Sequence, residues 1–92
     1  MKIIQLIYSL CSGGAERFVV SLSNQLVKMG HDVTICMLLS DENEDYLFNR
    51  QFTNSNVKFH SMGFQPGFSL KKVRDVENYI LSERPDVVHC HL

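Results

Sequence analysis

Residues 1–17 read MKIIQLIYSLCSGGAER, and this stretch decides the fold. Its first part, Lys2–Leu10, is an apolar, isoleucine-rich run that a Ser-Gly-Gly turn follows. An apolar run of this length that ends at turn residues is typical of a strand buried on both faces of a parallel sheet. A helical pattern begins at Ala15, so the stretch predicts a strand joined to a helix by a glycine turn.

The rest of the chain continues this alternation of strand and helix. Apolar residues recur every three or four positions from Ala15 to Met29, which predicts a helix with one apolar face, and Gly30 suits the position after its end. Asp41–Glu44 has the form of a capping box, which predicts a short helix near Asp45–Phe52.

The second half predicts one more long helix and two strands. Ser69 suits the N-cap of a helix that ends before Pro85. Glycine and proline predict a loop over Gly63–Gly67. The second half contains the predicted strands Val57–Met62 and Asp86–Leu92. A further strand, Val33–Leu39, is predicted after Gly30 in the first half.

This order of elements predicts an α/β fold of the Rossmann-like kind. Alternating strands and helices form right-handed βαβ units, which give a parallel sheet between two layers of helices. The expected strand order is 3-2-1-4, and ligands of such sheets bind at the carboxyl ends of the strands where the order reverses. Cys11–Ala15 follows the first strand and His89–His91 ends the fourth, so we expect both segments to line one crevice.

Composition narrows the class of protein. The chain has 92 residues, 45% hydrophobic and 21% charged, which excludes a disordered tail, a collagen-like repeat and a coiled coil. Its 9 basic and 10 acidic residues give no basic field, so we expect no nucleic-acid partner. Cys11, Cys36 and Cys90 are widely spaced and odd in number, which indicates reduced thiols rather than a disulfide framework.

No apolar stretch approaches the roughly 20 residues of a membrane span, so we expect a cytoplasmic protein. The segment Phe64–Arg74 combines aromatic and basic residues and leaves open a peripheral contact with the inner face of the membrane. A loop that packs its aromatics on the core and keeps its cations in water is the favoured interpretation.

The glycine turn offers a place for a ligand. Gly13 and Gly14 let a ligand approach the backbone, and the helix start supplies free N–H groups with a partial positive charge. A phosphate or a sugar hydroxyl suits such a place. The turn lacks both the G-x-G-x-x-G fingerprint and the P-loop, so a turn without a ligand remains an alternative.

The histidine pair is the second candidate site. His89 and His91 lie two residues apart, so their side chains share one face of a strand. We expect His91, nearer the strand end, to face the crevice and His89 to be a core histidine. A zinc site would need a third ligand, for which Cys11 is the candidate, whereas His31 and His60 should lie at other ends or edges.

Three segments together resemble glycosyltransferase family 4. They are SGGAER at Ser12–Arg17, LVKMGHDVT at Leu26–Thr34 and RPDVVHCH at Arg84–His91, in the order and spacing of that family. The resemblance implies a GT-B enzyme of two Rossmann-like domains that transfers a sugar from a nucleotide-sugar donor to a glycan, lipid or small-molecule acceptor with retention, as in polysaccharide biosynthesis.

The resemblance also implies roles for individual residues. Gly13 and Gly14 would approach the donor, Glu16 and Arg17 would belong to the substrate site, and His91 would face the transferred sugar as the catalytic histidine. The resemblance implies neither a bound metal nor a cofactor other than the nucleotide-sugar substrate.

The chain departs from the family in its extent. Residues 1–92 match only the first part of the N-terminal, acceptor-side domain, and the donor domain with its Glu-x7-Glu motif is absent, so we expect this chain alone to be inactive. Asp86–Leu92 would then be an edge strand through which the chain self-associates. A non-enzymatic α/β domain that binds a ligand or a protein, with an anion site at Gly13–Gly14, is the alternative function.

Overall fold

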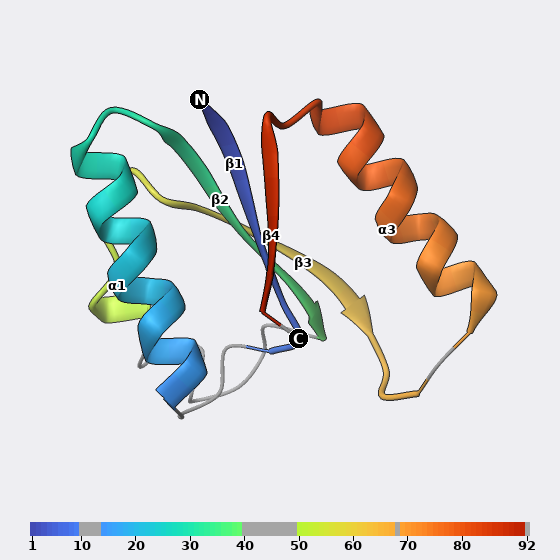
Figure 1. Ribbon diagram of the computed structural model, residues 1–92. Helices are drawn as coiled ribbons and strands as arrows, with labels where there is room; N and C mark the ends of the chain where they lie inside the picture. The colour runs from blue at the N-terminus through green and yellow to red at the C-terminus, as the bar shows by residue number, and fades with distance from the viewer. Residues whose placement is uncertain (10–13, 40–49, 68, 92) are drawn as a thin grey trace.

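The computed structural model describes residues 1–9, 14–39, 50–67 and 69–91 (Figure 1). Four strands and two long helices follow one another along these residues. In chain order they are β1 (Lys2–Ile7), α1 (Gly14–Lys28), β2 (Asp32–Leu39), β3 (Lys58–Phe64), α3 (Leu70–Glu83) and β4 (Val87–His91). Most of the short helix predicted near Asp45–Phe52 falls outside the described residues.

The four strands form one parallel sheet in the order β3-β2-β1-β4, which confirms the predicted α/β topology. Helices α1 and α3 lie on opposite sides of this sheet (Figure 1). Helix α1 connects β1 to β2 and α3 connects β3 to β4, because parallel pairing requires a crossover. The sheet therefore sits as the middle of three layers, with β1 and β2 at its centre.

The third strand extends further than the sequence predicted. Gly63 and Phe64, assigned to a loop, belong to β3, and Phe64 pairs with Leu39 after a register shift that follows Met37. Gly63 has a φ of 69°, a backbone conformation that glycine adopts without a steric penalty. The irregularity lets the strand continue past a residue that sequence rules treat as a breaker.

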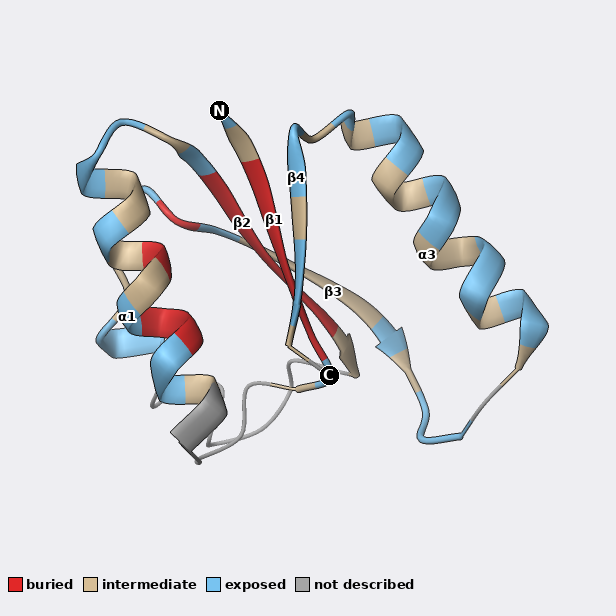
Figure 2. Cartoon of the chain, viewed as in Figure 1, coloured by how far each residue is buried: buried red, intermediate tan, exposed pale blue. Residues whose placement is uncertain are grey.

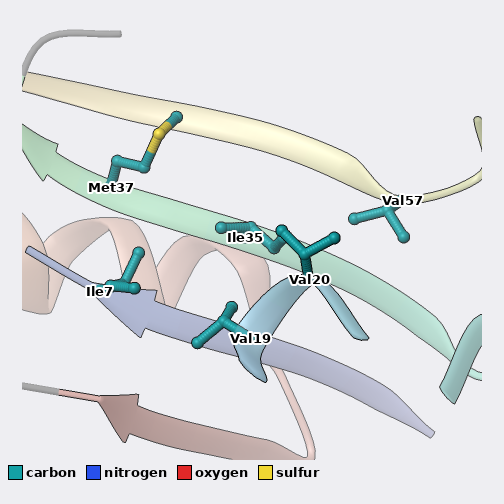
Figure 3. Close-up of a cluster of buried hydrophobic side chains, with 6 residues drawn as sticks. All are labelled: Ile7, Val19, Val20, Ile35, Met37 and Val57. Atoms are coloured by element: carbon teal, nitrogen blue, oxygen red, sulfur yellow. The ribbon is translucent and has the colours of Figure 1, made fainter. Parts of the chain in front are cut away.

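The better packed core lies between α1 and the sheet. Its buried side chains come from β1, β2, α1 and the residue before β3, and they are Ile7, Val19, Val20, Ile35, Met37 and Val57 (Figure 3). Val19 and Ile35 have no exposed surface. Burial of these side chains holds the apolar face of α1 against the sheet.

The α3 side is packed more loosely. Ile4, Leu6 and Cys36 are buried there, and the half-buried Val76 and Tyr79 of α3 pack against them. Helix α3 has no buried residue (Figure 2). Among the apolar residues of this helix, Leu70 is 78% exposed and Leu81 63% exposed. Interactions at the two ends of the helix, rather than burial of its side chains, therefore set where α3 begins and ends.

Both ends of α3 carry capping interactions. Ser69 is the predicted N-cap, and its Oγ accepts a hydrogen bond of 3.2 Å from the Lys72 N–H. At the other end Arg84 takes a left-handed conformation and its N–H donates to the Ile80 carbonyl. Pro85 follows, so the helix ends where the sequence predicted.

Candidate functional site

The carboxyl ends of β1 and β4 meet, as the topology predicted. The two strands are parallel neighbours in which Gln5 pairs with His89 and Ile7 with His91. Asp86 fixes the opposite end, because its N–H donates to the Lys2 carbonyl and its carboxylate accepts from the Lys2 N–H, both at 2.7 Å. This anchoring sets the register that brings the histidine pair beside the end of β1.

His91 is held by a residue of β1. Its Nε2 lies 2.7 Å from Oε1 of Gln5, which is fully buried. With Oε1 of the Gln5 amide facing the ring, the amide accepts the hydrogen bond and the His91 Nε2 carries the proton. Burial, and then the neighbouring His89, lower the pKa of His91 below its ordinary value. The ring is therefore a neutral imidazole at physiological pH.

His89 does not lie in the core, contrary to the prediction. It is exposed, and its ring centroid lies 4.0 Å from that of His91. The reason is that β4 is an edge strand of the described sheet. Val19 and Val20 of α1 pack over the central strands and not over β4. The expected position of His91 near the strand end is correct, and its ring is half-buried.

Phe18 adds an aromatic ring to the site. It lies on α1, is 57% exposed, and its ring centroid is 6.2 Å from that of His91 in an edge-on arrangement. The sequence pattern placed Phe18 in the apolar face that packs on the sheet, which the exposed ring contradicts. The ring that it contacts, that of His91, is distant in the sequence, so no local sequence signal identifies this pair.

The glycine turn and the start of α1 are only partly described. Gly13 lies outside the described residues, and Gly14 is the first residue of α1. Glu16 follows in the first turn, where a negative charge is favoured by the partial positive charge of the helix start. Arg17 is exposed, and no hydrogen bond or ion pair joins its side chain, or that of Glu16, to another residue of the described part.

The other histidines lie elsewhere. The Nδ1 of His31 is 3.1 Å from the N-terminal amine, at the amino ends of the strands, and His60 stacks on Tyr79 with centroids 4.1 Å apart. Among the described residues, no three histidine, cysteine, aspartate or glutamate side chains form a group that could hold a metal ion. Cys11, the one candidate for the third ligand that a zinc site would need, lies outside them.

A separate cavity of about 520 Å³ opens between α3 and the sheet. Apolar side chains from β1, β2 and α3 line most of it, with Lys72 among its polar residues. The Lys72 ammonium contacts the carbonyls of Gln65 and Gly67, the latter at 3.0 Å, and lies 5.7 Å from the centroid of the Phe64 ring. These contacts tie the loop before α3 to the helix.

Neither described helix is long and apolar enough to cross a bilayer. The segment that suggested a membrane contact also contains Leu70 and Val73, whose side chains are 78% and 50% exposed.

Residues 12–92 match the sequence model of Glycosyltransferase Family 4. The matched range includes the start of α1 and the whole of β4, which are the two elements that flank the end of β1. No curated protein matches the chain.

Proposed function

The chain belongs to glycosyltransferase family 4, and we propose that it forms the acceptor-side part of an enzyme that transfers a sugar from a nucleotide-sugar donor with retention. The proposal places residues 1–92 in the first part of an N-terminal Rossmann-like domain of GT-B type. A second domain of a longer polypeptide would hold the donor nucleotide.

One observation carries the proposal. The half-buried, neutral His91 lies at the carboxyl ends of β1 and β4, beside α1, whose first residue, Gly14, belongs to the glycine turn. Open α/β sheets bind ligands at this place, where the strand order reverses. A neutral imidazole beside an aromatic ring suits a polyhydroxyl substrate, because it hydrogen-bonds hydroxyl groups without carrying charge.

The remaining predicted residues have roles consistent with this placement. The backbone N–H groups at Gly13 and Gly14 would approach the donor phosphate and sugar from the helix start. Glu16 and Arg17, in the same turn of α1, would contact the substrates around them. His91 would face the transferred sugar. The proposal requires no metal ion.

Sugar transfer tests the proposal directly. The complete protein that carries this chain would be incubated with radiolabelled nucleotide sugars and candidate acceptors, and NMR would identify the anomer of the product. We expect turnover with retention. The 92-residue chain alone, as the matched control, should give no turnover.

Two outcomes would contradict parts of the proposal. Turnover by the isolated chain would show that no second domain is needed. Saturable binding of a protein partner by the complete protein, with no transfer from any nucleotide sugar, would favour a non-enzymatic binding domain instead.

A further inference from the structure

We propose that Gln5 is a positioning residue that fixes the tautomer of His91, so that His91 presents Nδ1 to the substrate as a hydrogen-bond acceptor for a sugar hydroxyl. This inference rests on the proposed function for the identity of the substrate. The part that concerns the tautomer stands on the structure of the chain alone.

Gln5 is an unusual residue for its place. Its exposed fraction is 0%, although it is polar, and its strand neighbours Ile4 and Leu6 are buried as well. Burying an amide in such a strand is costly unless its atoms form hydrogen bonds. The register places Gln5 directly opposite His89, on the face that also carries His91.

The contact with His91 determines where the ring proton lies. Because Oε1 of Gln5 can only accept, the Nε2 of His91 donates across the 2.7 Å contact. Burial and His89 lower the pKa of His91, so Nδ1 stays unprotonated. Within the described residues Gln5 is the one hydrogen-bond partner of this ring, which leaves the Nδ1 lone pair for a ligand.

A lone pair selects the chemistry of the ligand group. A hydroxyl can donate to Nδ1, whereas a phosphate or carboxylate offers only acceptor oxygens at neutral pH. His91 therefore favours a sugar hydroxyl over the donor phosphate. Protonation of Nδ1 would abolish this acceptor, so the contact should be lost at acidic pH.

The other end of the Gln5 amide argues against a purely stabilising role. Nε2 is buried and has no hydrogen-bond partner in the described part of the chain. An unsatisfied buried donor destabilises a fold, and an apolar side chain of similar shape avoids that penalty. We therefore expect Gln5→Met to keep the fold while it loses control of the His91 tautomer.

Nitrogen NMR of the 92-residue chain tests the tautomer. Long-range proton–nitrogen correlation distinguishes the protonated from the unprotonated ring nitrogen. We expect the native His91 to be a single Nε2-protonated tautomer. Gln5→Met should give a mixture of both tautomers, with amide spectra that show an intact fold. Gln25→Met, which changes an exposed glutamine of α1, is the matched control and should leave His91 unchanged.

Gln5→Glu provides a second, independent variant. Its carboxylate keeps an acceptor for Nε2–H and adds a negative charge, so the single tautomer should return while the pKa of His91 rises. A native His91 protonated on Nδ1, or a Gln5→Met chain with an unchanged tautomer, would overturn the positioning role.

The acceptor role is tested in the complete protein. If Nδ1 accepts a substrate hydroxyl, kcat/KM should fall as His91 becomes protonated, and the acidic limb of the pH profile should move to higher pH in Gln5→Glu. An acidic limb that stays in place would overturn the acceptor role. Absence of any sugar transfer would instead refute the proposed function, and the NMR result would still decide the role of Gln5.

Discussion

Ile35 is the residue whose truncation should destabilise the fold most clearly. It lies in β2 between Gln5 of β1 and Phe59 of β3 in the register, and its side chain has no exposed surface. It belongs to the cluster between α1 and the sheet. Ile35→Ala therefore removes contacts from the centre of the better packed layer.

The expected loss follows from the atoms removed. Replacing isoleucine by alanine deletes three carbons, and at about 0.8 kcal/mol for each buried carbon this gives about 2.4 kcal/mol. The cavity left behind adds to this loss, which places the total near 3–4 kcal/mol, within the range of about 2–5 kcal/mol for such substitutions. Ile35→Val deletes one carbon and should cost about 1 kcal/mol.

Urea denaturation followed by circular dichroism measures the change. A small domain loses about 1–3 kcal/mol of stability per molar urea, so Ile35→Ala should lower the midpoint by at least about 1 M. Leu70→Ala is the matched control on the exposed side of α3, where Leu70 is 78% exposed, and should change stability by less than about 0.5 kcal/mol.

If Ile35→Ala and Leu70→Ala lowered the midpoint equally, the assignment of the core to the α1 side would be wrong. Ile35→Val keeps the comparison measurable if the alanine variant is unfolded without denaturant.

Three further predictions concern thiols, pH and association. Burial raises the pKa of the Cys36 thiol to about 11, whereas Cys90 is exposed. Iodoacetamide should therefore label Cys90 in the native chain and Cys36 only after unfolding, as peptide mass spectrometry would detect. Labelling of Cys36 in the native chain would contradict its burial. The lowered pKa of His91 means that its contribution to stability is full above the ordinary value of 6.5 and is lost as pH falls through the folded-state pKa, because the unfolded chain takes up the proton first. Urea midpoints from pH 7.5 to pH 5 should therefore fall less in His91→Gln than in the native chain, and equal falls would refute this. Val87, which is 41% exposed, lies on β4 at the edge of the sheet that the described residues form, and we expect this edge to pair with a second copy. Sedimentation should therefore show concentration-dependent dimers that Val87→Lys weakens; a native monomer at high concentration would contradict the pairing.

Sequence periodicity was sufficient for the topology but not for exposure. The apolar runs and the helical spacing predict each of the described elements and the strand order, because the connections of βαβ units have one hand. The same patterns placed Phe18 in the packed face of a helix and His89 in the core. Both side chains are exposed, because burial depends on which element covers them rather than on their own spacing.

The site shows the same limit. The sequence identifies His91 because its strand ends at the predicted crevice, whereas it gives no role to Gln5, a polar residue within the apolar run Lys2–Leu10. A single buried polar residue was the available signal. Its role depends on the pairing of β1 with β4, which brings Gln5 within hydrogen-bond distance of His91, 86 positions away in the sequence.

The most direct test of the site is the rate of sugar transfer by the complete protein after substitution of His91. Loss of one hydrogen bond costs about 0.5–1.5 kcal/mol, and 1.4 kcal/mol corresponds to about tenfold in rate. We predict that His91→Ala lowers kcat/KM by up to about tenfold through loss of this bond, while His31→Ala, at the opposite ends of the strands, leaves it unchanged. An unchanged kcat/KM in His91→Ala, or an equal loss in His31→Ala, would contradict the assignment of the site to the carboxyl ends of β1 and β4.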